Sequence, residues 1–191
     1  MNSNLLEWFI KPLLLHRRGV GKSGLEVSSG VLGSVYEVIM TKWGAGIDVE
    51  IKQTDQLDNI YQDAREIRRH VFVGEQGINE ADEFDGTDSD AIHFVAYQGG
   101  QPVATARTTV TADGVHIQRV ATEKEYRHKG YAKQLLTTIL QSPMFQDTPR
   151  FYLGAQATAI GFYETLGFKQ YGQPFMEVGI KHVNMEKLVT S

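Results

Sequence analysis

Apolar residues recur at helical spacing through residues 132–140, and this segment predicts the clearest helix in the chain. The apolar positions are Ala132, Leu135, Leu136, Ile139 and Leu140. They fall on one face of a helix with 3.6 residues per turn. A stretch over residues 115–120 with β-branched Val115, Ile117 and Val120 precedes them and favours a strand. The polar and basic residues in between therefore form a loop that joins a strand to a helix, and the helix begins at or near Gly130.

An earlier strand and helix are predicted upstream of this unit. Residues 49–52 favour a strand, and Asp55 is placed to cap the helix that follows. The apolar face of that helix is formed by Leu57, Ile60, Tyr61, Ala64, Ile67 and Val71. An acidic loop comes next, and it contains Glu80, Asp82, Glu83, Asp85, Asp88 and Asp90.

Three strands joined by tight turns are expected between the acidic loop and the basic loop. They cover residues 91–97, 102–110 and 115–120. Gly99-Gly100 forms the first turn and residues 112–114, Ala-Asp-Gly, form the second. The chain therefore makes a three-stranded meander here.

The C-terminal third predicts a strand, a helix and two more strands. The strands cover residues 150–154, 168–171 and 180–188, and the helix covers residues 157–166. Gly167 is placed to end that helix as a C-cap. Together with the preceding elements, this order indicates an α/β domain.

Residues 1–46 differ from this regular pattern and are expected to form an N-terminal extension to a domain over residues 47–191. Residues 5–15 predict either a docking helix or a disordered arm, and residues 35–39 a short strand. Gly21-Lys22-Ser23 ends like a phosphate-binding P-loop, but His16 stands where that pattern needs a glycine. A P-loop is therefore disfavoured.

Composition excludes several classes of function. The formal charge of −4 argues against a general nucleic-acid-binding protein. Cysteine is absent, which excludes disulfides, thiolate metal sites and a cysteine nucleophile, and fits a reducing compartment. No apolar run is long enough to span a bilayer, so we expect a cytoplasmic protein without membrane contact. The six histidines show no ligand spacing, and no metal site is predicted.

The basic loop before the helix is suited to a phosphate or pyrophosphate. Arg127, His128 and Lys129 precede Gly130, and Lys133 lies in the first helical turn. The first N–H groups of a helix lack partners and the macrodipole is positive there, which favours an anion. The alternative is an ordinary solvated loop.

The order and spacing of these motifs resemble the GNAT superfamily of N-acetyltransferases. Arg127, Gly130 and Ala132 fill its signature Arg/Gln-x-x-Gly-x-Gly/Ala, and residues 156–168 are similar to its late helix with Phe-Tyr-Glu and Leu-Gly-Phe. Residues 68–76 and 179–182 are similar to a small bacterial branch often labelled ElaA-like or YjcF-like. The resemblance covers about residues 48–188.

This resemblance implies the GNAT acyl-CoA N-acyltransferase fold, a mixed and mostly antiparallel sheet flanked by helices, with acetyl-CoA as cosubstrate. Tyr163 would protonate the departing thiolate. The end of the strand would bind pantetheine, the basic loop would bind pyrophosphate through its amides, and Gln156 stands where many members have asparagine. The residues implied in cofactor binding are Val120, Ala121, Arg127, His128, Lys129, Gly130, Tyr131, Ala132, Lys133 and Gln156. The family also makes a homodimer plausible.

Acetyl transfer to an amine needs a held thioester, a neutral amine and stabilisation of the oxyanion and thiolate. Without cysteine, the acceptor must attack directly in a ternary complex. A base or a water chain must deprotonate the amine. The resemblance places four candidates for this base on the acceptor side of the fold, Glu75, Glu83, Asp85 and His93, of which Asp85 and His93 are also candidates for binding the acceptor. The sequence does not choose among these four.

Arg107 and Arg119 lie on adjacent strands of the second hairpin. A three-residue turn over residues 112–114 would place them opposite one another, where like charges destabilise the sheet. Either Glu83 or Asp85, or a carboxylate of an amino-acid-like acceptor, would then lie between them. The alternative is a two-residue Asp113-Gly114 turn that leaves one arginine in solvent.

The acidic loop allows two interpretations. It is either a solvated run of charges or a surface that steers a cationic amine. Ala81 occupies the first ligand position of an EF-hand, which excludes that calcium site. Two further functions stay open: a non-catalytic acyl-CoA binding or sensing domain, and an acyl-homoserine-lactone synthase-like acyltransferase.

Overall fold

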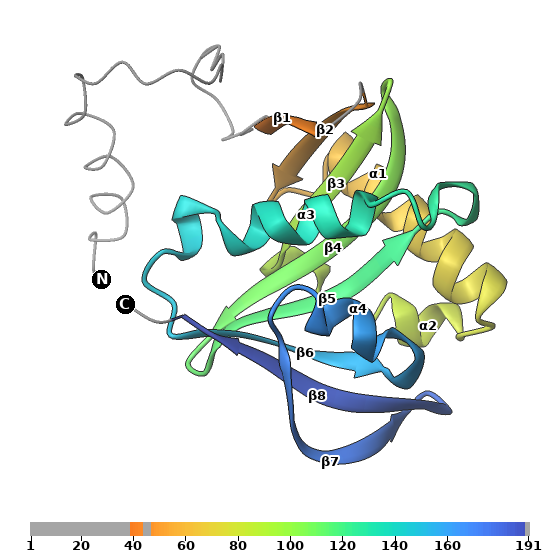
Figure 1. Ribbon diagram of the computed structural model, residues 1–191. Coiled ribbons are helices and arrows are strands. Elements are labelled where there is room, and N and C mark those ends of the chain that lie inside the picture. The colour runs from red at the N-terminus through yellow and green to blue at the C-terminus, as the bar shows by residue number, and fades with distance from the viewer. Residues whose placement is uncertain (1–38, 44–46, 190–191) are drawn as a thin grey trace, which may run out of the picture. The chain divides into compact units, whose positions relative to one another are not determined.

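The computed structural model describes residues 39–43 and 47–189, which contain one eight-stranded sheet with helices on both faces (Figure 1). The spatial order is β1-β2-β3-β4-β5-β6-β8-β7, and of the neighbouring pairs β5 and β6 alone are parallel. The strands are β1 (Ile39–Trp43), β2 (Ile47–Thr54), β3 (Ile92–Gln98), β4 (Gln101–Thr111), β5 (Gly114–Thr122), β6 (Arg150–Gln156), β7 (Lys169–Glu177) and β8 (Ile180–Leu188). The predicted mixed, mostly antiparallel sheet is confirmed.

The helices are short and join the strands in the predicted order. They are α1 (Asn59–Arg68), which continues as a π-helix (Arg69–Glu75), α2 (Glu80–Glu83), α3 (Tyr131–Leu140) and α4 (Ile160–Glu164). Single 3₁₀ turns cover Asp88–Asp90, Lys124–Tyr126, Pro143–Phe145 and Ala157–Ala159. The acidic loop of the sequence analysis is therefore partly helical.

The start of α1 differs from the prediction by one turn. Asp58, and not Asp55, is the N-cap, because its Oδ1 accepts hydrogen bonds from the backbone N–H groups of Ile60 (2.9 Å) and Tyr61 (3.1 Å). Leu57 then precedes the helix and is 57% exposed instead of joining its apolar face.

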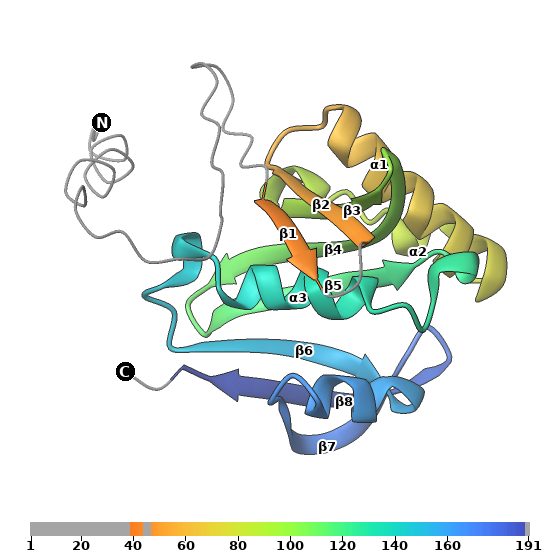
Figure 2. The ribbon, with the colours of Figure 1, turned by 45° about the horizontal axis from the view of Figure 1, so that its top comes forward.

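Two apolar cores lie on opposite faces of the sheet. On one face α3 and α4 pack against the strands, and Leu135, Leu136 and Ile139 of α3 are completely buried. On the other face α1 and the π-helix bury Ala64 and Ile67 against β3. Figures 1 and 2 show α3 and α1 on opposite sides of β4. The helical spacing of α3 predicted this burial correctly.

The turn between β4 and β5 has neither of the two predicted forms. Thr111 pairs with Gly114, so Ala112 and Asp113 are the two residues of the turn. The register of the hairpin is therefore shifted from both expectations.

Arg119 lies in a β-bulge and is not paired with Arg107, which the three-residue turn would have placed opposite it. Arg107 pairs with Gln118, Thr105 pairs with Ala121, and β5 has one more residue than β4 in between. Arg119 has a φ of 53°, a left-handed conformation that is uncommon for a residue other than glycine. The predicted direct pairing of Arg107 with Arg119 is wrong.

The β5 and β6 strands pair over a very short length and then separate. Val115 pairs with Phe151 and His116 with Tyr152, and no further pair follows between these two strands. Figure 2 shows the gap between them beside α3 and α4. After His116, β5 has no pairing partner on the side of β6, whereas Ala121 and Thr122 still pair with β4 on its other side.

Several expectations concern the N-terminal part of the chain. Residues 5–15, the Gly21-Lys22-Ser23 motif and residues 35–38 lie outside the described residues. Strand β1 begins at Ile39 and pairs with β2, so the sheet already includes residues assigned by sequence to the extension. Within the described residues, no helix combines the length and the apolar character that crossing a membrane requires.

Candidate active site

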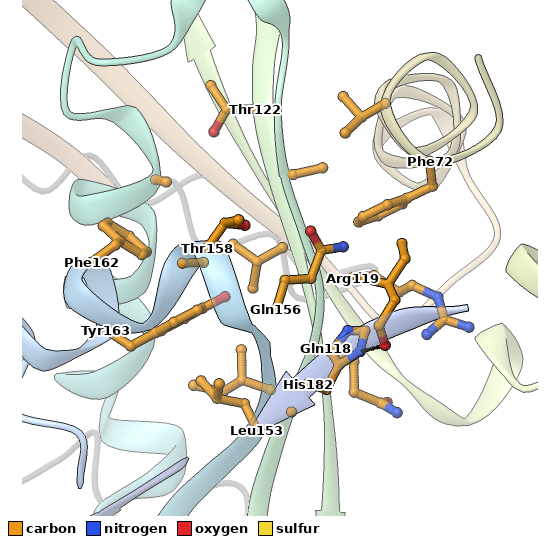
Figure 3. Close-up of a pocket in the computed structure, with 18 of the residues that line it drawn as sticks. Phe72, Gln118, Arg119, Thr122, Leu153, Gln156, Thr158, Phe162, Tyr163 and His182 are labelled. Atoms are coloured by element: carbon orange, nitrogen blue, oxygen red, sulfur yellow. Dashed lines mark hydrogen bonds between the residues drawn. The ribbon is translucent and has the colours of Figure 1, made fainter. Parts of the chain in front are cut away.

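A cavity of about 990 Å³ occupies the place where β5 and β6 separate. Its lining comes from both faces of the sheet: the basic loop and α4 on one side, and β5, β6, β7, β8 and the end of the π-helix on the other. Figure 3 shows Phe162 and Tyr163 on one side of the cavity, with Arg119, Gln118 and His182 across from them. Two reactants can therefore approach one point from opposite faces of the sheet.

The N-terminus of α3 lies at one end of this cavity, as predicted. Gly130 is its N-cap with a φ of +90°, and no described atom lies within 4 Å of the position that a Cβ would take. The first amides of α3 have no intrahelical acceptor and the macrodipole adds positive potential. Ala132 and Lys133 of the first turn also line the cavity. These features fit a phosphate group.

The arginine of the basic loop already has a partner. Its guanidinium donates to Oε1 of Glu75 at 2.7 Å and to the carbonyl of Thr122 at 3.0 Å. Glu75 lines the cavity beside the loop and is one-third exposed. Arg127 thus ties the π-helix to the loop. His128 is exposed and lines the cavity, whereas Lys129 does not line it and its ammonium lies 5.1 Å from the centre of the Tyr126 ring.

The other residues that were predicted to bind the cofactor offer different groups to the cavity. Val120 and Ala121 lie at the end of β5 and line the cavity. The Tyr131 side chain is buried and donates to Gln98, so this residue offers the cavity its backbone. Gln156, at the end of β6, donates to Oε1 of Gln76 at 3.0 Å across the gap.

Tyr163 on α4 is buried among aromatic rings, and its hydroxyl points into the cavity (Figure 3). Its ring makes edge contacts with Phe162 at 5.0 Å and Phe168 at 6.0 Å between centroids. Burial raises the pKa of Tyr163 above its ordinary value, so the phenol keeps its proton at neutral pH. Within the described residues, no side chain or backbone group hydrogen-bonds this hydroxyl. It is a free donor next to the gap.

A buried cluster of ion pairs lies behind the bulge. Arg68 is completely buried and bonds Glu83 at 2.6 Å and Asp88 at 2.8 Å. Arg107 bonds Asp88 at 2.6 Å, and Arg119 contacts Glu83 at 3.0 Å. Burial alone would raise the pKa of Asp88, but the two arginines outweigh it and lower the value to about 2. For Glu83, burial prevails and raises the pKa.

Carboxylates of the acidic loop therefore accompany both arginines, one of the two arrangements that the sequence analysis allowed. Asp85 lies 3.3 Å from Arg119 and 3.7 Å from Arg107. His93 Nε2 donates to the carbonyl of Asp88 at 2.9 Å, and burial lowers the pKa of this histidine.

Of the predicted base and acceptor residues, Glu75, Glu83 and Arg119 line the cavity. Arg107, Asp85 and His93 do not, because they belong to the cluster behind the bulge. Both glutamates are paired with arginines, Glu75 with Arg127 and Glu83 with Arg68 and Arg119. The sequence could not show these pairs, because each joins residues far apart in the chain.

No role was predicted from the sequence for the side chains that line the cavity across from Tyr163. They are His116, Gln118, Tyr152, Tyr171, Phe175, Glu177, His182 and Asn184. His182 and Asn184 alternate on β8, which is the signal that could have placed them on one face. Their common cavity depends on pairing among β6, β8 and β7, which no local pattern reports.

Comparison with known proteins identifies the family. The family model described as "Acetyltransferase (GNAT) domain" matches residues 48–189, and the chain belongs to this family. ElaA of Escherichia coli is 32% identical over 131 residues, which are 65% of this chain and 84% of ElaA. The predicted likeness to the ElaA branch is confirmed.

Two solved structures show the same fold at higher coverage. A protein from Lactobacillus plantarum superposes with a TM-score of 0.67 and 31% identity over 74% of this chain and 99% of that one. An acyl-CoA N-acyltransferase from Pseudomonas aeruginosa gives a TM-score of 0.65 and 29% identity, with the same coverage. These matches span nearly the whole of each neighbour, so this chain contains a domain with their fold.

Proposed function

We propose that this protein transfers the acetyl group of acetyl-CoA to a primary amine, which attacks the thioester directly in a ternary complex. The observation that carries the proposal is the cavity through the gap between β5 and β6. It joins a helix N-terminus suited to phosphate, a free tyrosine hydroxyl and a polar face across the sheet. The likeness to an acyl-CoA N-acyltransferase supports the choice of cosubstrate.

The residues present fit coenzyme A. The amides at the start of α3 are available to the pyrophosphate, and Gly130 leaves the approach to them open. Pantetheine is an extended amide chain, so it can hydrogen-bond the last residues of β5, Val120 and Ala121, where β6 has separated. The backbone at the bulge can polarise the acetyl carbonyl and stabilise the oxyanion.

Tyr163 would complete the reaction from the α4 side. Collapse of the tetrahedral intermediate releases the sulfur as a thiolate, which needs a proton. The raised pKa of Tyr163 keeps its hydroxyl protonated until that moment. The attacking amine reaches the same carbon from the β7–β8 side of the sheet.

Calorimetric titration with acetyl-CoA, with ATP as control, tests the first half of this proposal. We expect binding of acetyl-CoA and much weaker binding of ATP. A screen of primary amines for thiol release tests the second half. Folded protein that binds neither ligand would refute the cofactor site, and tight acetyl-CoA binding without thiol release from any amine would refute catalysis.

A further inference from the structure

The acceptor side of the cavity needs a group that can take a proton from the incoming ammonium. The carboxylates of Glu75 and Glu83 are held by arginines, as described above. Among the remaining lining residues, a histidine on β8 stands out. His182 is only 7% exposed and lines the cavity.

One ring nitrogen of His182 is fixed by the backbone. Nδ1 lies 2.9 Å from the carbonyl oxygen of Ile180. A carbonyl can only accept, so Nδ1 carries the hydrogen and the neutral ring has its lone pair on Nε2. Nε2 lies 3.9 Å from a carboxylate oxygen of Glu177, too far for a hydrogen bond but close enough to stabilise a positive charge on the ring.

The ring is held in place by its neighbours. Phe175 stacks on His182 with 5.6 Å between the ring centroids and an angle of 25°. Gly154 on β6 leaves room for this pair, because a Cβ there would lie 3.1 Å from Cζ of Phe175 and 4.0 Å from Cδ2 of His182. The imidazole thus has one stacked partner, one backbone anchor and one free nitrogen.

The strand register places His182 at the end of the gap where transfer would occur. His182 pairs with Gln156, whereas β5 and β6 last pair at His116 and Tyr152. Gln156 lies four residues after Tyr152 on β6, so these two positions are about 13 Å apart at 3.3 Å per residue. His116 is the other histidine on this face of the cavity. It stacks on Tyr152 with 4.5 Å between the ring centroids, and it lies about 13 Å farther from the end of β5.

We infer that His182 is the general base of the proposed acetyl transfer, with Glu177 as the positioning residue that stabilises its protonated ring. This inference rests on the proposed function. Nε2 takes one proton from the acceptor ammonium, and the nitrogen lone pair forms the C–N bond. The C–S bond breaks and its electron pair stays on sulfur, which Tyr163 protonates. The second proton of the nitrogen leaves to solvent, so the products are an amide, a thiol and a net proton.

Other titratable groups surround this site. They are His116 on β5, Arg119 at the bulge, Tyr152 on β6, Tyr171 and Glu177 on β7, and Asp82 and Glu83 on α2. Arg119 is paired with Glu83 and Asp85. Among the described residues, Glu177 is the charged group that lies close to Nε2 of His182.

Imidazole ¹⁵N NMR tests the geometry without an acceptor. We expect neutral His182 to be the Nδ1–H tautomer. A neutral ring with its hydrogen on Nε2 would overturn the inference, because no lone pair would then face the cavity.

Kinetics with two amines of one skeleton test the role. The probes are ethylamine, protonated at neutral pH, and the far less basic trifluoroethylamine, which is already neutral there. The His182→Asn variant keeps an amide donor for Ile180 but has no basic nitrogen. We expect its rate to fall by about 10²-fold or more with ethylamine and by much less with trifluoroethylamine.

His116→Gln is the matched control, since it removes an imidazole from the same cavity and should change the rates with the two amines by the same factor. Unaltered acetyl-CoA affinity shows that each variant is folded. Equal losses of His182→Asn with both amines would overturn the base role while the proposed function stands. Wild-type protein that releases no thiol with any amine would instead refute the proposed function, and the base role with it.

Discussion

Replacing Gly130 by aspartate should separate the stability of the fold from the affinity for coenzyme A. Gly130 has a φ of +90° and open space at its Cβ position, so the cost to the fold is conformational and not steric. A left-handed residue other than glycine costs about 1–2 kcal/mol, and aspartate is among those that tolerate it. A carboxylate at a helix N-terminus returns about 0.3–1 kcal/mol. The free energy of unfolding should therefore change by only about 1 kcal/mol.

The effect on binding should be larger and electrostatic. A carboxylate about 5 Å from a pyrophosphate with two negative charges costs 332 × 2/(80 × 5), or about 1.7 kcal/mol, even at the dielectric constant of water. This energy corresponds to about 17-fold weaker binding at low ionic strength. Salt should reduce the difference, because the Debye length falls to about 3 Å at 1 M.

Calorimetric titration of acetyl-CoA into Gly130→Asp and Gly130→Asn provides the assay. Asparagine has nearly the same shape and tolerates the left-handed conformation, but it has no charge. We expect the aspartate variant to bind more weakly than the asparagine variant at low salt, and the two to converge at high salt. Equal affinities at low salt, or a difference that salt leaves unchanged, would refute a pyrophosphate at this helix terminus.

Three further outcomes follow from the same geometry. Tyr163→Phe should lower kcat by about 10²-fold or more while acetyl-CoA affinity stays the same; an unchanged rate of thiol release would exclude Tyr163 as the acid. Arg68→Met should lower the free energy of urea unfolding by about 3–5 kcal/mol, since it takes the shared guanidinium away from two buried carboxylates, whereas Arg69→Met, which removes only surface ion pairs, should cost much less. The pKa of Asp88 is about 2, below its ordinary 3.8, so the ionised carboxylate contributes about 2 kcal/mol of stability above pH 4 that is lost as the pH falls towards 2; carboxyl ¹³C NMR should give a midpoint near pH 2, and one near pH 4 would contradict the cluster.

Local patterns were sufficient to place several elements of the fold. The helical spacing after Gly130 placed α3 correctly, and the alternation over residues 180–188 placed β8. These elements depend on residues within a few turns of one another, which is what periodicity reports.

Other features depend on contacts between residues far apart in the chain, which sequence spacing does not report. The bulge at Arg119 results from a one-residue difference between β4 and β5, and the two-residue turn gives no sign of it. The acidic loop was predicted to be either a solvated run of charges or a surface that steers a cationic amine, yet Asp88 and Glu83 are buried with Arg68. His182 gains its place from two strand pairings, with Gln156 on β6 and Phe175 on β7.

The short parallel pairing between β5 and β6 also has a consequence for how the domain opens. Strands β1 to β5 form one antiparallel block and β6, β8 and β7 another, and two paired positions on each of β5 and β6 connect them within the sheet. Blocks that share so few pairings in the sheet can differ in amide-exchange protection, even though the core under α3 and α4 contains residues of both. A ligand that hydrogen-bonds both sides of the gap would link these units, so that protection in β6 and β8 rises to the level of β3 and β4 once the ligand is bound.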